Sequence, residues 1–186
     1  MNLKLFFSYC INLKKLKKIK LFVFDIDGVM TDGKLIFDDN GIETKSFNTL
    51  DGMGIVMALK AGIKVAVITG SKANCVKKRF DKFRVHGFED LIQGEEYKMP
   101  ALLTLIEKYG LKNEEVAYMG DDIIDLAPTK YVGFSFAPQN AINEVKKIAN
   151  IVLDKKGGNG AVRLAIDMVL KARGDYERII KDFSSF

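Results

Sequence analysis

The chain has 186 residues, of which 48% are hydrophobic and 28% charged, a composition that is ordinary for one soluble globular domain with one core. No apolar run reaches the roughly 18 residues of a transmembrane helix, and Cys10 and Cys75 are isolated, which indicates reduced thiols in a cytoplasmic protein. The net charge of +5 comes from residues 1–20, which contain six of the 29 basic residues and no acidic one. The rest of the chain has 23 basic and 24 acidic residues and is nearly neutral, so a nucleic-acid surface is not expected.

The first segment, residues 1–19, has apolar residues at helical spacing and lysines on the other face, which predicts an N-terminal basic helix. The lysines follow the apolar part, and a small-residue cleavage site is missing, so a signal peptide is not expected. We expect this helix to pack on the edge of a sheet; a helix lying on a membrane surface is the alternative.

The stretch Leu21–Gly33 (LFVFDIDGVMTDG) begins as a short apolar run and ends in acids and glycine. This pattern is typical of a buried parallel strand that breaks into a loop. Loops at the carboxyl ends of parallel strands form the binding crevice, so Asp25 and Asp27 are expected there, with Gly28 turning the chain. Placing two carboxylates at the end of a buried strand costs free energy, which indicates that they bind a cation or take part in a reaction.

A hairpin is predicted next, with strands over Lys34–Phe37 and Glu43–Phe47 around the turn Asp38–Gly41. Asp51 is expected to cap a helix over Gly52–Ala61, which Gly62 ends.

Further strands and helices alternate along the rest of the chain. The predicted strands are Lys64–Thr69, Asp90–Ile92, Glu115–Met119, Tyr131–Phe136 and Ile151–Val152, and the predicted helices are Lys72–Phe83, Tyr97–Tyr109, Asn140–Ile148 and Ala161–Ala172. Such alternation predicts an α/β fold with a doubly wound parallel sheet. The expected organisation is a single domain over residues 1–186, with the hairpin at 34–47 as a flap, no large cap domain, and a C-terminal tail over 174–186.

Polar residues from three strand ends should therefore meet at one edge of the sheet. They are Asp25, Asp27, Thr69, Asp121 and Asp122, joined by Lys98 from the start of a helix. Phosphate monoesters repel nucleophiles until their charge is neutralised. Carboxylates that hold a divalent cation, preferably Mg²⁺, can do this, and a carboxylate can also serve as the nucleophile. The set predicts a phosphoryl-transfer site.

The string D-x-D-G-V-x-T-D-G at residues 25–33, then Ile68-Thr69-Gly70, Lys98 and Gly120-Asp121-Asp122-x-x-Asp125 resembles the motifs of the haloacid dehalogenase superfamily. The T-D-G ending is similar to its cap-less sugar-acid phosphatases, typified by the 3-deoxy-manno-octulosonate 8-phosphate phosphatases. The resemblance covers Leu21 to about Arg173.

The resemblance also implies roles for the matching residues. Asp25 would be the nucleophile and Asp27 the general acid and base, while Thr69 binds phosphate oxygens and Lys98 supplies positive charge. Asp25, the Asp27 carbonyl and Asp121 would hold Mg²⁺, with Asp125 supporting them and Asp122 paired with Lys98. The residues implied in substrate binding are Asp27, Asn48, Asp51, Gly52, Gly70, Arg79, Lys98 and Arg163.

The sequence also departs from this pattern, because Leu50, Val56 and Ser71 stand where the family often has arginine. Arginine is the usual reader of carboxylate and phosphate. The implied substrate is a phosphorylated 2-keto-3-deoxy sugar acid, and a 9-phosphorylated nonulosonic (sialic-type) acid is the alternative. A non-catalytic module, like those fused to cytidylyltransferases, is the alternative of another class, and the intact acid and lysine set argues against it.

The hairpin carries the apolar residues Leu35, Phe37, Ile42 and Phe47, more than an isolated flap should expose to solvent. Its edges also present unpaired backbone groups. Both features, and the resemblance, predict a homotetramer built around the hairpin.

Overall fold

The computed structural model describes residues 2–185 and contains a parallel sheet of six strands. Their order is β5 (Asp90–Gln93), β4 (Lys64–Thr69), β1 (Leu21–Phe24), β6 (Val116–Met119), β7 (Phe134–Ala137) and β8 (Ile151–Val152). The chain runs outward from β1 through β4 to β5 and then returns to β6 on the other side of β1. The carboxyl ends of β4, β1 and β6 therefore lie side by side at the point where the strand order reverses, which is where ligands bind in such sheets. The predicted doubly wound α/β fold is confirmed.

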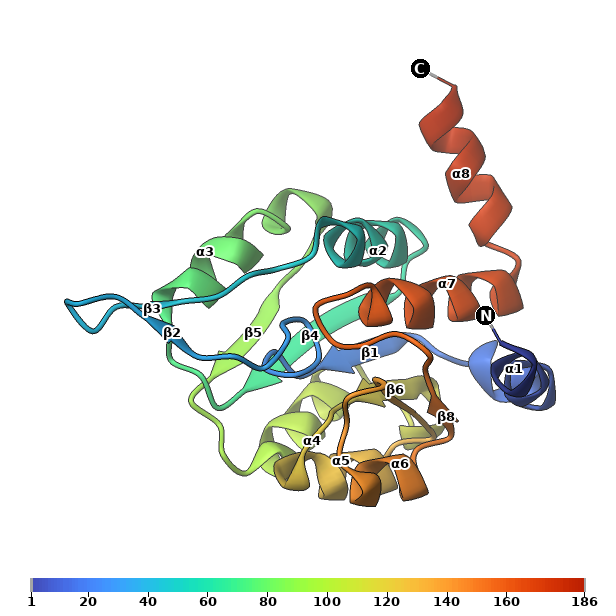
Figure 1. Ribbon diagram of the computed structural model, residues 1–186. Helices are drawn as coiled ribbons and strands as arrows, with labels where there is room; N and C mark the ends of the chain where they lie inside the picture. Colours follow the sequence, from blue (N-terminus) through green and yellow to red (C-terminus); the bar gives the residue numbers. More distant parts are fainter. Residues whose placement is uncertain (1, 186) are drawn as a thin grey trace.

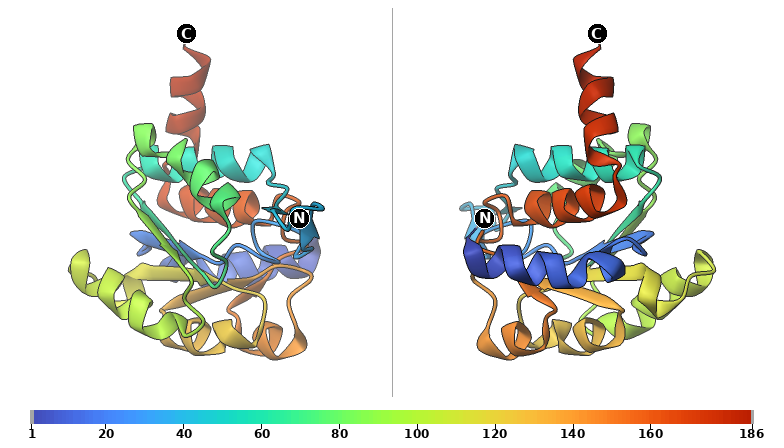
Figure 2. Two further views of the ribbon diagram at one scale, coloured as in Figure 1. Left: turned by 90° about the vertical axis from the view of Figure 1, so that its left-hand side faces the viewer. Right: turned by 90° about the vertical axis from the view of Figure 1, so that its right-hand side faces the viewer.

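Helices cover both faces of the sheet (Figures 1 and 2). One face carries α2 (Thr49–Lys60), α3 (Asn74–Asp81) and α7 (Ala161–Arg173), and the other carries α4 (Lys98–Lys108), α5 (Leu126–Tyr131) and α6 (Asn143–Ile148). In β1, Phe22 and Phe24 join the core under the first group, whereas Leu21 and Val23 join the core under α4. This two-sided burial is why the strand is apolar at every position.

The first helix, α1 (Leu3–Leu16), lies against α7 and the edge strand β8, so the expected packing on the sheet edge is confirmed. It buries Leu5 and Leu16 and leaves Leu3, Phe7 and Ile11 exposed. None of the helices in residues 2–185 is both long and apolar enough to cross a membrane.

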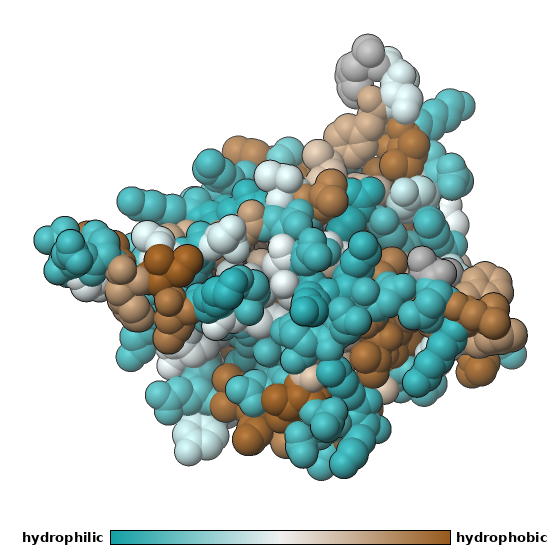
Figure 3. All heavy atoms as spheres, in the orientation of Figure 1, coloured by the Kyte–Doolittle hydropathy of each residue, from teal (hydrophilic) through white to brown (hydrophobic). Residues whose placement is uncertain are grey.

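The hairpin is present but short, with β2 (Ile36–Phe37) and β3 (Glu43–Thr44) projecting from the body beyond the carboxyl ends of the strands (Figure 1). Asp38 shapes its turn by accepting hydrogen bonds from the backbone of Asn40 and Ile42 at 3.0 and 2.8 Å. A space-filling view shows apolar residues along it (Figure 3). The exposed fraction is 64% for Leu35, 50% for Ile36, 58% for Phe37 and 59% for Ile42.

Several predicted boundaries need correction. The cap of α2 is Asn48, whose side chain accepts from the Leu50 N–H, and Asp51 lies inside the helix, so the prediction that Asp51 caps it is wrong. The strand expected from Tyr131 begins only at Phe134, because α5 runs to Tyr131. The segment predicted as a tail contains α8 (Tyr176–Ser184), anchored through the buried Ile179. Short 3-10 helices at Arg84–His86, Asn113–Glu115 and Ile123–Asp125 also escaped prediction.

Candidate active site

A buried lysine joins two aspartates beneath the carboxyl ends of the central strands. Lys98, the first residue of α4, places its Nζ 2.9 Å from Asp25 Oδ1 and 2.7 Å from Asp125 Oδ1. Its side chain is fully buried. Burial alone would lower the pKa of Lys98, but the two carboxylates outweigh it and raise that pKa, so the lysine remains charged. Asp122 instead caps the Ile123 N–H, so the predicted pairing of Asp122 with Lys98 is wrong.

Asp125 has both carboxylate oxygens engaged. Besides Lys98, Oδ1 accepts from the Tyr118 hydroxyl at 2.5 Å, and Oδ2 accepts from the N–H groups of Asp121 and Asp122 at 2.9 and 3.2 Å. Gly120 makes this packing possible, because a Cβ at that position would come within 2.3 Å of Asp125 Cβ. Asp125 thus fixes both Lys98 and the loop after β6.

Asp25, Asp121 and Asp125 have carboxylate oxygens within 4.8 Å of one another. Burial, aided by the repulsion from Asp125 and opposed by Lys98, raises the pKa of Asp25 to about 7. Burial and repulsion from Asp25 raise the pKa of Asp121 to about 7 as well. Because a hard divalent cation between two such carboxylates would remove this repulsion, the donor set fits Mg²⁺. Asp125 is already saturated, which leaves Asp25 and Asp121 as the carboxylate ligands.

Asp27, two residues beyond Asp25, interacts with the hairpin. Its Oδ1 accepts from the Thr31 hydroxyl at 3.3 Å and lies 2.6 Å from Lys45 Nζ. The sequence analysis missed Lys45. The available signal was the spacing of Glu43 and Lys45, which puts both on one face of an extended segment.

Thr69 ends β4, beside Asp25 at the end of β1, and is buried. Its Oγ1 accepts from the Ser71 N–H at 3.1 Å, so its own O–H remains a donor. Gly70 leaves open space beyond this turn, since the nearest atom to an added Cβ is 4.0 Å away. This geometry is compatible with the expected contact to phosphate oxygens.

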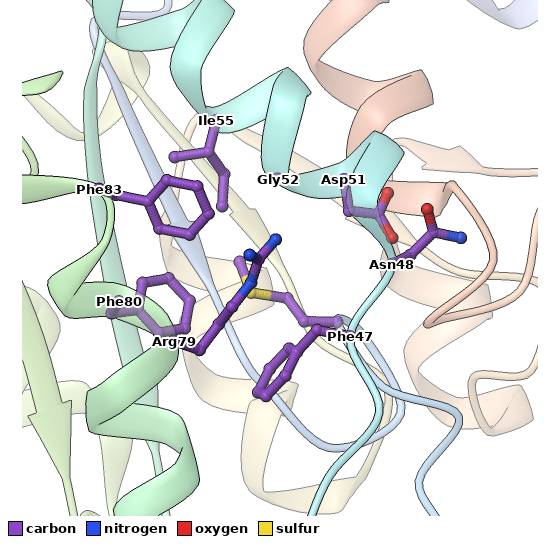
Figure 4. Close-up of a pocket in the computed structure, with 9 residues that line it drawn as sticks. Phe47, Asn48, Asp51, Gly52, Ile55, Arg79, Phe80 and Phe83 are labelled. Carbon is purple, nitrogen blue, oxygen red and sulfur yellow. The ribbon is translucent and has the colours of Figure 1, made fainter.

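Four of the other residues expected to bind substrate, Asn48, Asp51, Gly52 and Arg79, line a pocket at the start of α2 (Figure 4). Asn48 Nδ2 donates to the Gly158 carbonyl at 3.2 Å. Asp51 accepts from the backbone N–H groups of Gly160 and Arg163 at 3.3 and 2.8 Å. These bonds fasten the glycine-rich loop at 157–160 and the start of α7 to α2.

The two arginines expected to bind substrate, Arg79 and Arg163, have different partners in the structure. Arg79 lies between the rings of Phe47 and Phe83, and a Cβ on Gly52 would come within 2.2 Å of its Nη2, so Gly52 makes room for it (Figure 4). Arg163 Nε is bound to Asp167 at 2.8 Å on α7. Within residues 2–185, neither guanidinium forms an ion pair with the cluster of Asp25, Lys98 and Asp121.

Comparisons with known proteins show which sequences and folds this chain resembles. The family model of the haloacid dehalogenase-like hydrolases matches residues 74–165. A 3-deoxy-D-manno-octulosonate 8-phosphate phosphatase of Salmonella typhi is 41% identical over 87% of this chain and 85% of its own length. Its counterpart in Haemophilus influenzae is 39% identical over 87% and 88%.

Solved structures of such enzymes are also similar. The phosphatase from Moraxella catarrhalis, in complex with magnesium ion, phosphate ion and a KDO molecule, has a TM-score of 0.87 and 36% identity and covers 92% of this chain and 97% of its own. A cobalt-bound form of the Haemophilus influenzae enzyme has a TM-score of 0.82 and 39% identity, and the match covers 87% of this chain and 93% of that enzyme's chain.

Proposed function

The chain belongs to the haloacid dehalogenase-like hydrolases and is a phosphoric monoester hydrolase of the 3-deoxy-D-manno-octulosonate 8-phosphate phosphatase type; on this premise we propose how it works and on what. The observation that carries the proposal is the group of buried Asp25, Lys98 and Asp125 with half-buried Asp121, at the point where the strand order of the sheet reverses. An unused cluster of this kind would cost stability, because each buried charge has to be desolvated.

Asp25 serves as the nucleophile. Lys98 binds its Oδ1 and stabilises the ionised form, which leaves Oδ2 for attack on phosphorus. As the new Asp25–phosphorus bond forms, the bond from phosphorus to the sugar oxygen breaks and Asp27 donates a proton to that oxygen. Asp27 then takes a proton from water, which hydrolyses the aspartyl phosphate and restores Asp25.

The cofactor is Mg²⁺, held by Asp25, Asp121 and the backbone carbonyl of Asp27. When bound, it supplies the positive charge that lets an anionic phosphate approach an anionic nucleophile. Thr69 and Gly70 bind phosphate oxygens, and Lys98 adds a second positive charge at the same edge.

The substrate is a phosphorylated 2-keto-3-deoxy sugar acid, foremost 3-deoxy-D-manno-octulosonate 8-phosphate, as the names of the relatives and the KDO in one neighbour support. The competing substrates are the 9-phosphorylated nonulosonic acids, because this chain has Leu50, Val56 and Ser71 where the family often has arginine. Arg79 and Arg163 are candidate anion binders, together with Asn48, Asp51 and Gly52 around them.

The working form is a cytoplasmic homotetramer joined through the hairpin. Four exposed apolar side chains on a two-stranded ribbon, Leu35, Ile36, Phe37 and Ile42, favour burial against other copies of the chain. A neighbouring subunit would also help to enclose a site that has no cap of its own.

The test is phosphate release by the purified protein from a panel of phosphorylated sugar acids, hexose phosphates and an aryl phosphate, with Mg²⁺ or with a chelator. We expect metal-dependent release and a preference for the octulosonate ester. A preference for the nonulosonate ester would assign the competing substrate. Full activity after exhaustive chelation, or none on any ester with Mg²⁺, would contradict the proposal.

A further inference from the structure

Lys45 stands out because it is a buried charge outside the acidic cluster. It follows β3 in the hairpin, and its side chain is only 1% exposed, although Thr44 and Ser46 on either side of it are exposed. Its Nζ lies 2.6 Å from Asp27 Oδ1 and 2.6 Å from Glu43 Oε1. Lys45 thus links the hairpin to the loop after β1 as a cation held between two carboxylates.

Stability alone does not explain this arrangement. A buried lysine has to be desolvated, and a well-packed apolar side chain of similar size is often as stabilising as a buried ion pair. Burial would lower the pKa of Lys45, but the carboxylates of Asp27 and Glu43 outweigh it and raise that pKa, so the group stays charged. What the contact does provide is a defined position for the Asp27 carboxylate.

That position matters because Lys45 and Thr31 both engage the same oxygen of Asp27, Oδ1. The other oxygen, Oδ2, is left to exchange a proton with a leaving group. A general acid has to lie within hydrogen-bond reach of the atom it protonates, and small displacements cost much of its effect.

We propose that Lys45 is a positioning residue of the reaction: from the hairpin it holds the Asp27 carboxylate in the orientation in which it protonates the departing sugar oxygen. This inference rests on the proposed function, in which Asp27 is the general acid. It also means that a residue of the hairpin contacts the proposed general acid directly. Glu43, which also contacts Lys45, is paired in register with the exposed Phe37.

The test compares Lys45→Met with wild type on two substrates: 3-deoxy-D-manno-octulosonate 8-phosphate, whose alkoxide leaving group needs a proton, and p-nitrophenyl phosphate, whose leaving group does not. We expect kcat/KM of Lys45→Met to fall about 10²-fold on the sugar ester, the lower range for general acid catalysis, and by only a few fold on the aryl ester. Lys45→Arg, which keeps a charged donor, should recover part of the loss. The matched control is Lys34→Met, which removes an exposed lysine of the same hairpin and should act like wild type on both esters.

Two further measurements separate positioning from other roles. The partners of Lys45 are partly exposed, Asp27 at 32% and Glu43 at 21%, so they can hydrate when it is removed, and we expect the unfolding temperature of Lys45→Met to stay near that of wild type. The affinity for 3-deoxy-D-manno-octulosonate with Mg²⁺, measured by calorimetry, should also be unchanged.

An equal loss on both esters, or a loss of sugar-acid affinity that accounts for the whole effect, would overturn the inference in favour of a structural or a substrate-contact role. Wild-type kinetics of Lys45→Met on the sugar ester would also overturn it while leaving the proposed function intact. A wild type that hydrolyses neither ester would refute the proposed function itself and the inference with it.

Discussion

Replacing Lys98 with methionine tests the charge balance of the site most directly. Methionine keeps an unbranched apolar side chain and removes the ammonium group, which in the wild type lies 2.9 Å from Asp25 and 2.7 Å from Asp125 in full burial. Without metal, the variant has to bury this acidic cluster with no cation beside it. We expect the cluster to compensate by taking up one more proton than in the wild type.

The magnitude follows from the cost of that proton. An aspartate in the unfolded chain has a pKa of about 3.9, so protonating one at pH 7 costs about 1.4 kcal/mol for each of roughly three pH units, or about 4 kcal/mol. This is an upper value, because the methionine no longer carries the desolvation cost of lysine, and it agrees with the cost of about 3–5 kcal/mol that is typical of breaking a buried pair. Above about pH 4 the folded variant then holds more protons than the unfolded chain. The loss in its free energy of unfolding relative to wild type therefore grows as the pH rises, from about 1.5 kcal/mol at pH 5 to about 4 kcal/mol at pH 7.

The assay is urea unfolding of wild type and Lys98→Met at pH 5 and pH 7 with a chelator present. Lys108→Met is the control: Lys108 lies on the same helix but is 43% exposed, so its pairs with Glu89 and Asp90 should contribute about 1 kcal/mol or less. A deficit of Lys98→Met that is equal at the two pH values, or no larger than that of the control at pH 7, would refute the electrostatic reasoning.

Four further outcomes are expected. Asp25→Asn should abolish phosphate release with the circular dichroism spectrum unchanged, because an amide is no nucleophile; turnover near that of wild type would exclude the covalent route. Mg²⁺ should raise the unfolding temperature more at pH 8 than at pH 5.5, because the carboxyls of Asp25 and Asp121, with pKa values of about 7, have to lose their protons to bind it; scanning fluorimetry with equal shifts at both pH values would contradict this. Asp51→Ala should lower the free energy of unfolding by about 2–3 kcal/mol, because it strips the acceptor from two backbone N–H groups at the start of α7, and a change under about 0.5 kcal/mol in urea unfolding would show that they find other partners. Glutamate at both Leu35 and Phe37 should yield smaller species with impaired catalysis, and a wild type that light scattering shows to be a fully active monomer would refute the assembly.

Local sequence patterns determined much of this protein. The apolar runs that end in Asp25, Thr69 and Met119 became the central strands, because a strand buried on both faces has to be apolar throughout. Since parallel strands present their carboxyl ends at one edge, the order of the motifs was enough to predict that Asp25, Lys98 and Asp121 meet. The turn Asp38–Gly41 likewise predicted the hairpin from its own side-chain chemistry.

The tertiary structure decided which partner each polar side chain takes. Asp122 and Asp125 both follow β6, and only the 3-10 turn at Ile123–Asp125 aims Asp125 rather than Asp122 at Lys98. Asp51 looked like a cap for its own helix but accepts from residues more than a hundred positions away, at the start of α7. Lys45 meets Asp27 only because the chain, on leaving the hairpin after β3, passes the loop after β1. The periodicity of hydrophobic residues indicates which face of a helix or strand is buried. The partner of a buried charge depends instead on how elements distant in sequence pack against one another, and a local pattern does not encode that packing.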